Sequence, residues 1–334
     1  MADFHCILDP IIDGELLYQE QPIDVKNPYY IHLGGLFNSF YPHDWGELAG
    51  SKSFKISIKG AAKDATISVF LHAPSTPPQT VQRLKTTLSG EQFEIVLADI
   101  LPEPGQRLSC QIESAMPVEL ESVSWTAISE FVREVKLGIV MCTYNNEARL
   151  KQNVRRLIAS EIWSQEKAVI IVANNGAIND VSWFPKDRFY NYDQENLGGS
   201  GGFGRGIYEI VHGRLKDEGI THILLMDDDV DFSPEVIGRA AAFHRKSKRP
   251  VVIGGSMLKI DDPTWLHEAG SNLDSIHKIA TSTDIPIGPI EKTKALDHLG
   301  KTSQYDYNAW WFCSFPSDAV RTVGMPLPLF IHGD

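Results

Sequence analysis

Residues 1–130 alternate between apolar and polar positions in short runs, with turn signals between the runs. β-branched and aromatic residues are frequent in the runs, and pairs such as Gly34-Gly35 and Pro77-Pro78 separate them. Strands are predicted at 29–33, 53–58, 65–71, 92–97, 107–112 and 118–125. Short strands at this spacing are typical of an antiparallel β-sandwich, so residues 1–130 are predicted to form a jelly-roll-like β-sandwich domain.

At Val135 the pattern changes to apolar strands that alternate with amphipathic helices. Residues 150–162 and 203–215 place apolar positions three and four apart, and a further helix is predicted to start with Ser233 as its N-cap and Pro234 in its first turn. Strands are predicted at 136–141, 168–173, 223–226 and 251–253, and those at 168–173 and 223–226 are expected to be buried in the sheet. This order predicts an α/β domain at 136–334 with a mainly parallel sheet.

Composition and charge narrow the classes of function. The chain has 334 residues, of which 43% are hydrophobic, and this is enough for two domains with separate cores. Its net charge of −12 argues against nucleic acid as a partner and against a general attraction to anionic membranes. The four cysteines form no CxxC pair that would indicate a zinc site. The sequence has neither a signal-peptide pattern nor a membrane-spanning apolar run, which predicts a cytoplasmic protein.

Three adjacent carboxylates, Asp227, Asp228 and Asp229, follow the apolar run at 223–226. Such a cluster needs a neutralising cation, and carboxylate oxygens are ligands that Mg²⁺ and Mn²⁺ prefer. Asp227 and Asp229 point the same way on an extended chain, so they are the predicted metal ligands beside a bound diphosphate. An acidic, solvated loop is the alternative, but ligands of open α/β sheets bind where the strands end.

Polar residues also follow two other predicted strands of this sheet. Thr143 and Asn145 come after 136–141, and Asn174-Asn175-Gly176 come after 168–173. We expect these side chains to offer hydrogen bonds to a base and a ribose beside the metal. Alternatively, Thr143 or Asn145 caps the helix that follows.

A glycine-rich turn at 196–206 contains a GxGxxG match from Gly199 to Gly204. The match by itself would indicate a dinucleotide-binding fold, but it lies in the third unit of the sheet and follows a polar run. Glycine amides at a helix start, with Arg205 one turn further on, are better suited to a sugar diphosphate. The alternative is a close approach of helix and strand, which also needs small residues.

Together these motifs resemble the family 2 inverting glycosyltransferases of GT-A fold. The matching segments are CTYN at 142–145, ANNG at 173–176, NLGGSGGFGRG at 196–206, LLMDDDV at 224–230, NAWWFC at 308–313 and FIHGD at 330–334. The chain is most similar to the bacterial galactofuranosyltransferases, in which a β-sandwich precedes the GT-A domain. The resemblance is specific over 136–334 and architectural over 1–130.

The resemblance implies roles for individual residues. Asp227 and Asp229 match the aspartates that hold Mn²⁺ or Mg²⁺ against the diphosphate of UDP. Trp310 and Trp311 match a pair beside the acceptor, and packing into the core is the alternative for one of the two. The positions that match the donor-binding part of the family are Thr143, Asn145, Asn175, Gly199, Arg205 and Asp228.

Asp334 matches the first of two adjacent acids on the acceptor side, and the second acid is taken as the general base of the family. The expected base and a metal-binding histidine would follow Asp334, and His332 comes too early to replace that histidine. The resemblance therefore implies a GT-A domain that is incomplete at its C-terminus. Donor binding is expected to be retained, and turnover is expected to be weak or absent.

The function implied is that of a metal-dependent inverting glycosyltransferase. It would transfer galactofuranose from UDP-galactofuranose to a lipid-linked or polymeric glycan in the synthesis of a cell wall or surface polysaccharide. The full-length protein would work peripherally at the inner face of the plasma membrane, and homo-oligomers are compatible with this interpretation. Alternatives are a rhamnosyl or other hexosyl transferase of the same fold, a non-catalytic glycan-binding protein and a nucleotide-dependent oxidoreductase.

Overall fold

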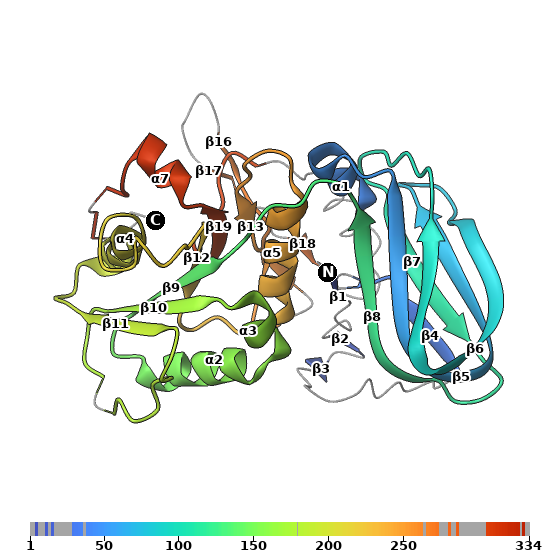
Figure 1. Cartoon of the computed structure of the whole chain (residues 1–334), viewed down its shortest axis with the longest axis horizontal. Helices are drawn as coiled ribbons and strands as arrows, with labels where there is room; N and C mark the ends of the chain where they lie inside the picture. The colour runs from blue at the N-terminus through green and yellow to red at the C-terminus, as the bar shows by residue number, and fades with distance from the viewer. Residues whose placement is uncertain are drawn as a thin grey trace.

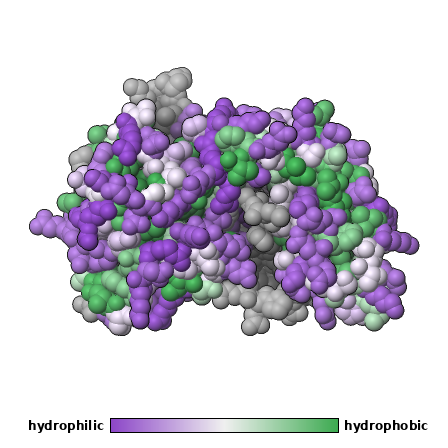
Figure 2. Space-filling model, viewed as in Figure 1, coloured by the Kyte–Doolittle hydropathy of each residue, from purple (hydrophilic) through white to green (hydrophobic). Residues whose placement is uncertain are grey.

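Figure 1 shows a computed structural model of the chain, in which a β-rich region and an α/β region lie side by side. The structure describes residues 29–35, 38–178, 180–262, 265–273, 305–327 and 329–330, and the backbone of short strands at 4–5, 11–12, 15–16, 280–281 and 285–286. Hydrophilic residues dominate the face seen in Figure 2, with hydrophobic residues scattered over both regions. Among the described helices, none is long and apolar enough to span a membrane.

A single six-stranded antiparallel sheet forms the β-rich region. Its strands are β1 (Phe4–His5), β4 (Tyr30–Leu33), β5 (Ser53–His72), β6 (Gln79–Leu97), β7 (Arg107–Glu113) and β8 (Glu119–Ile128), and helix α1 (Pro42–Ala49) lies beside them. β5 pairs with β6 along nearly its whole length, with β8 over its first half and with β7 over its second half. The long hairpin of β5 and β6 therefore belongs to two layers, and the folded sheet is a β-sandwich, as predicted.

Register shifts in the middle of β5 carry this strand from one layer to the other. The shifts fall between Lys59 and Ala65. Core-facing side chains of β5 are even-numbered before the shifts, as at Ile58, and odd-numbered after them, as at Ile67. An extra residue at a bulge bends a strand and changes which side chains face inwards. The turn predicted between 53–58 and 65–71 is therefore an irregular bend within one continuous strand.

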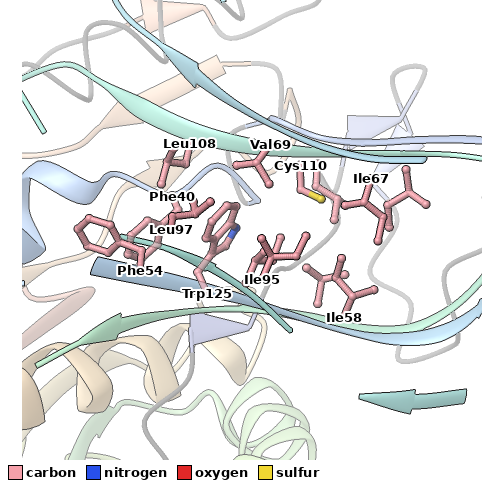
Figure 3. Close-up of a cluster of buried hydrophobic side chains, with 14 of the residues drawn as sticks. Phe40, Phe54, Ile58, Ile67, Val69, Ile95, Leu97, Leu108, Cys110 and Trp125 are labelled. Carbon is pink, nitrogen blue, oxygen red and sulfur yellow. The ribbon is translucent and has the colours of Figure 1, made fainter. Parts of the chain in front are cut away.

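The core of the sandwich fills the space between the two layers (Figure 3). Residues of both layers point into it, among them Phe40, Phe54, Ile58, Ile67, Val69, Ile95, Leu97, Leu108, Cys110 and Trp125. The indole of Trp125 is fully buried and stacks on Phe40, with ring centroids 5.5 Å apart. Large aromatic side chains of this kind supply much of the apolar area that holds a sandwich together.

The α/β region is built on a six-stranded sheet in the order β11-β10-β9-β12-β19-β13. Its strands are β9 (Leu137–Thr143), β10 (Val169–Asn174), β11 (Phe189–Asp193), β12 (His222–Asp227), β13 (Ile253–Gly254) and β19 (Phe312–Pro316). Neighbouring strands are parallel except at β19, which runs antiparallel to β12 and to β13. The mainly parallel sheet confirms the predicted fold class, and the insertion of β19 between two parallel strands is a feature that the sequence pattern does not predict.

Helices cover both faces of this sheet (Figure 1). α2 (Glu147–Ala159), α3 (Glu161–Glu166) and α5 (Glu235–Lys246) pack on one face, and α4 (Gly198–Val211) and α7 (Asp318–Val323) pack on the other. The N-cap of α5 is Pro234, so the prediction of Ser233 as the cap is wrong by one residue; the carbonyl of Ser233 accepts a hydrogen bond from the backbone N–H of Val236. Short strands form further small sheets: β2 (Ile11–Ile12) with β3 (Glu15–Leu16), β14 (Met257–Leu258) with β15 (Trp265–Glu268) and β18 (Ile285–Pro286), and β16 (Asn272–Leu273) with β17 (Ala280–Thr281).

Helix α5 also joins the two regions. Its Ala242 is part of the sandwich core, and its Phe243 lies edge-on to Trp45 of α1, with ring centroids 4.8 Å apart. Just after α5, the backbone N–H of Lys248 donates to the carbonyl of Leu48 at 2.8 Å. One side of α5 therefore packs on the parallel sheet and another side packs on the sandwich.

Candidate functional site

Three neighbouring strands end together at one edge of the parallel sheet. Asn174, the last residue of β10, pairs with Thr143, the last residue of β9, and Asp227 ends β12 opposite Cys142. The polar residues predicted as candidates from three separate motifs are thus brought to adjacent strand ends. This is the edge at which ligands of open α/β sheets bind.

The three aspartates at the end of β12 differ in exposure. Asp227 is half-buried, Asp228 is 8% exposed and Asp229 is exposed. The carboxylate of Asp228 is turned into the protein, where it accepts hydrogen bonds from Thr143 Oγ1 at 2.5 Å and from Asn146 Nδ2 at 3.3 Å. Burial raises the pKa of the Asp228 carboxyl, and these hydrogen bonds oppose that rise. The middle aspartate is therefore held by the protein, and its two neighbours lie nearer to solvent.

The side chains at this edge offer a metal ion only part of a coordination shell. The described residues contain no group of three or more His, Cys, Asp or Glu side chains arranged to hold a metal. Asp227 and Asp229 can supply two carboxylates, and Mg²⁺ is often bound by one or two carboxylates together with substrate phosphates and water. The donor set therefore fits an ion that binds together with a diphosphate rather than one that binds alone.

Hydrogen bonds of the predicted donor-binding residues tie the loops of this edge together. Asn175, which is 5% exposed, donates from Nδ2 to the carbonyl of Gly198 at 2.9 Å and accepts from Gln194 Nε2 at 2.8 Å. Asn145 is exposed, and its side-chain oxygen accepts from the N–H of Ala177 at 3.2 Å. The cap position of α2 is Asn146, so capping by Thr143 or Asn145 is not what the structure shows.

The glycine-rich turn forms the first turns of α4, at the same edge. Gly198 has a left-handed φ of 70°, and its N–H donates to the Asn196 side chain at 3.0 Å. A Cβ at Gly202 would overlap the sulfur of Cys142, so the close approach of helix and strand is present. Gly199 is different, because it is exposed and a Cβ there would meet nothing within 4 Å.

Cys142 lies beneath this helix and beside the aspartates. Burial, followed by the charges of Asp228 and Asp227, raises the pKa of its thiol to about 12. The thiol is therefore protonated at neutral pH. Because the thiolate is the nucleophilic form of cysteine, this shift argues against covalent catalysis by Cys142.

Arg205 is engaged with residues on α4 and β11. Its Nε donates to Glu209 Oε1 at 2.8 Å, and its guanidinium lies 4.9 Å from the ring centroid of Tyr192. Glu209 is buried and also accepts the N–H of Arg214 at 3.0 Å. Sequence reasoning missed Glu209, although its spacing of four residues from Arg205 is the spacing of a helical ion pair.

The two tryptophans precede β19 and come to the same edge, because Phe312 of β19 pairs with Met226 of β12. Trp310 lies edge-on to Phe203 of α4, with ring centroids 5.6 Å apart. Trp311 donates from Nε1 to the carbonyl of Gly255 at 2.8 Å. Both are partly exposed, so each keeps some surface for a ligand while it packs against the protein.

Leu327 and Phe330 lie beside the first turn of α4. The hydroxyl of Ser200 donates to the carbonyl of Leu327, and a Cβ at Gly198 would overlap the carbonyl oxygen of Phe330. The segment that leads to Asp334 thus passes beside the glycine-rich turn. Asp334 itself, the candidate acceptor-side acid, lies outside the described residues.

Sequence reasoning also missed the amides that hold this edge, chiefly Asn153 of α2. Asn153 is 4% exposed and donates to two backbone carbonyls of the loop after β12. Its signal in the sequence is a polar residue on the apolar face of a helix, next to Val154 and between Leu150 and Leu157. A buried amide needs partners, so such a position predicts a specific hydrogen-bonding role.

Comparison with known proteins agrees with this geometry. The family model described as "Glycosyl transferase family 2" matches residues 138–302. Galactofuranosyltransferase GlfT2 of Mycobacterium tuberculosis is 29% identical over 321 residues, which is 89% of this chain and 49% of the relative. The protein of the same name from Mycolicibacterium smegmatis is 29% identical over 261 residues, 73% of this chain and 39% of the relative. The chain thus spans about half the length of these curated relatives, or less.

Among solved structures, the mannosyltransferase PcManGT of Pyrobaculum calidifontis matches with a TM-score of 0.39 and 8% identity, over 57% of this chain and 47% of that chain. A likeness this slight carries no argument about the present chain. The family match and the two relatives cover the strand ends described above. Residues 138–302 are thus similar to the family 2 glycosyltransferases, and most of the chain is similar to two galactofuranosyltransferases.

Proposed function

We propose that this chain contains the donor site of a metal-dependent, inverting glycosyltransferase that uses a nucleotide diphosphate sugar. The observation that carries the proposal is the meeting of Asp227 and Asp229 with Thr143 and Asn175 at adjacent strand ends. Our choice of donor is UDP-galactofuranose, because both curated relatives are named galactofuranosyltransferases. The acceptor we propose is a lipid-linked or polymeric glycan of a cell wall or surface polysaccharide.

In this proposal the outer aspartates hold a Mn²⁺ or Mg²⁺ ion against the donor diphosphate. The ion supplies charge neutralisation to the departing nucleotide. Asp227 and Asp229 provide its carboxylate ligands, and Asp228 keeps the end of β12 in place through Thr143. Asn145 and Asn175 lie on the loops beside them and bind the nucleoside.

The start of α4 binds the donor from the other side. Gly199 leaves open space at the first turn, where backbone N–H groups point out of the helix and attract phosphate oxygens. Arg205 adds positive charge further along α4. Arg205 is paired with Glu209. It therefore acts on the donor either at a distance, through its charge, or directly, after it has exchanged Glu209 for a phosphate.

On the acceptor side, Trp310 and Trp311 present ring surface to a sugar. An inverting displacement needs a carboxylate on the side of the anomeric carbon away from the leaving group, to take the proton of the acceptor hydroxyl. Asp334 belongs to the acidic pair that would serve there. The positions of Leu327 and Phe330 beside the first turn of α4 support this placement, because Asp334 follows them closely in the sequence.

We assign this chemistry to a domain at residues 136–334, preceded by a sandwich domain at 1–130. We place the full-length protein at the inner face of the plasma membrane, because its acceptor is a membrane-linked glycan and its donor is a cytoplasmic nucleotide sugar. Homo-oligomers are compatible with this proposal, and light scattering of the purified chain measures whether they form.

Calorimetric titration of the whole chain with UDP, with and without Mn²⁺, tests the proposal. We expect UDP to bind at least about tenfold more tightly with Mn²⁺ than without it, which corresponds to about 1.4 kcal/mol. NADH is the control nucleotide and should not bind. Affinity for a glycan that is indifferent to UDP and Mn²⁺ would instead support the non-catalytic glycan-binding alternative.

A further inference from the structure

We infer that helix α2 acts as the positioning element of the aspartate pair, through Asn153 and Arg156, which fix the loop after β12 without touching the ligand. The inference rests on the proposed function, since the pair that is positioned is the proposed metal clamp. It concerns residues 228–232, the five residues that directly follow β12. The contacts of this loop with α2 carry the argument.

Asn153 holds the backbone of this loop at two points. Its Nδ2 donates to the carbonyl of Asp228 and to the carbonyl of Val230, each at 2.9 Å. A side-chain amide has two N–H donors on one nitrogen, which is what two carbonyls at neighbouring points of a loop require. Since Asn153 is buried, a residue without these donors would leave both carbonyls with poorer partners in a place that water reaches with difficulty.

Asp228 is held through its side chain as well as its carbonyl. Its carboxylate accepts one hydrogen bond from Thr143 Oγ1, at the end of β9, and another from Asn146 Nδ2, at the cap position of α2. Rotation of this carboxylate towards solvent would break both hydrogen bonds. With Asp228 held inward, its neighbours remain nearer to solvent: Asp227 at the end of β12 is half-buried, and Asp229 in the bend that follows is exposed.

Arg156 fastens the far end of the loop. It forms an ion pair with Asp231, and it donates to the carbonyl of Phe232 at 3.2 Å. Both side chains of this ion pair are mostly buried, with 19% and 25% exposure for Arg156 and Asp231. The pair is therefore screened less by water than a surface pair would be.

The cap residue Asn146 and the α2 residues of this network lie on one side of the helix. Asn146, Asn153 and Arg156 are spaced seven and three residues apart, which brings them to the same face in a helix of 3.6 residues per turn. Leu150 and Leu157 pack α2 into the core beneath the sheet. Because α2 is packed into the core, these three polar residues are held in place. They therefore set the path of residues 228–232 before any ligand binds.

Replacement of Asn153 by alanine in the whole chain tests this role. We expect the Mn²⁺-dependent gain in UDP affinity to fall by at least about tenfold, and UDP affinity without Mn²⁺ to stay within about twofold. Amide hydrogen exchange of residues 228–232, measured without ligand, should become faster in the same variant. Arg155→Ala is the matched control, because Arg155 is the exposed neighbour on the same helix, and neither readout should change.

Arg156→Gln is the second variant, for the case that Asn153→Ala does not fold. Glutamine keeps a side-chain N–H donor near the carbonyl of Phe232, so the fold should stay intact while exchange becomes faster at the end of the loop near Asp231. The Mn²⁺-dependent gain in UDP affinity should fall less than in Asn153→Ala, by about three- to tenfold.

The outcomes separate the two claims. If the unaltered chain shows no Mn²⁺-dependent binding of UDP, the proposed function is overturned. If that binding is present and remains unchanged in folded Asn153→Ala and Arg156→Gln, the positioning role alone is overturned. Unchanged hydrogen exchange at 228–232 in both variants overturns the positioning role whatever the nucleotide results are.

Discussion

The sandwich and the parallel sheet of this chain bury different kinds of polar group. The buried polar residues of the sandwich are mostly serines, together with Asn38 and Arg107, and its largest fully buried side chains, such as Trp125, are apolar. At the ligand edge of the parallel sheet, amides and a carboxylate are buried side by side, as at Asn153, Asn175 and Asp228. Buried amides and carboxylates are costly unless each finds partners. The contrast indicates that the sandwich is organised around packing and the sheet edge around the orientation of a few polar groups.

Trp125→Ala should give the largest effect, on stability alone. Deletion of this fully buried indole is expected to lower the free energy of unfolding by about 3–5 kcal/mol, because the cavity between the two layers can close only in part. Urea unfolding followed by circular dichroism measures the change. Val96→Ala, at a sandwich position that is 57% exposed, is the control and should change stability by less than about 0.5 kcal/mol. If Trp125→Ala lowered the free energy of unfolding by less than about 1 kcal/mol, the claim that the sandwich is organised around packing would be contradicted.

Asp229→Ala should lower ligand affinity and leave stability nearly unchanged, which is the opposite of the result expected for Trp125→Ala. Calorimetry should show Mn²⁺-dependent UDP affinity reduced by about a hundredfold, or about 2.7 kcal/mol, because one of two carboxylate ligands is gone. The melting temperature should stay nearly constant, because an exposed carboxylate beside two others contributes little to the fold. Asp187→Ala removes another exposed carboxylate, distant in sequence, and should leave binding unchanged. Equal affinity in the two variants would remove Asp229 from the mechanism.

Acid should weaken the α/β region through two buried histidines. His222 of β12 and His244 of α5 lie with ring centroids 4.3 Å apart, and burial lowers the pKa of His222 to about 4 and that of His244 to about 3. Both folded values lie below the ordinary value of 6.5, so the unfolded chain binds protons first. Their contribution to stability is therefore complete above pH 6.5 and is lost as the pH falls towards 4.

We expect this pair to remove on the order of 3 kcal/mol from the free energy of unfolding between pH 6.5 and 5. Urea unfolding at several pH values measures the slope, and the double variant His222→Gln, His244→Gln should flatten it. His72→Gln is the matched variant of the sandwich, where burial lowers the pKa of a single histidine to about 4, and its effect should be smaller. A slope that the double variant leaves unchanged would refute the assignment to this pair.

Gly198→Ala should give the smallest loss, of about 1–2 kcal/mol. The left-handed φ of 70° strains any other residue, and the added methyl group would displace the carbonyl of Phe330. Amide hydrogen exchange at Phe330 should become faster. Gly199→Ala, one residue further and in open space, should keep stability within about 0.5 kcal/mol while it lowers UDP affinity. Equal stability of the two variants would show that the turn tolerates side chains at both positions.

The parts of the fold that the sequence predicts are those that local patterns determine. β9, β10 and β12 are read from uninterrupted apolar runs, because central strands are buried on both faces. Their ends then locate Thr143, Asn175 and the aspartates, since parallel strands must finish at a common edge. The sandwich was predictable as a class for the same reason, from alternation and turn residues.

Features that depend on distant partners leave no such local pattern. The continuity of β5 is hidden because Gly60, which looks like a turn residue, sits at a bulge where the backbone of β8 comes close. The inward orientation of Asp228 depends on Asn146 and Thr143, more than 80 residues earlier in the chain. β19 enters the sheet between β12 and β13 through pairing that only the folded chain reveals. Whether Arg205 reaches the donor stays a prediction.

Because helix α5 belongs to both cores, the boundary between the two regions is a packed interface and not a flexible hinge. It places Ile237 and Ala241 in the core under the parallel sheet, while Ala242 and Phe243 complete the packing of the sandwich. The sandwich could not simply be replaced by that of another protein, because the chimaera would need a new packing partner for the ring of Phe243. An α/β fragment produced alone would expose that ring to water and would tend to associate through it.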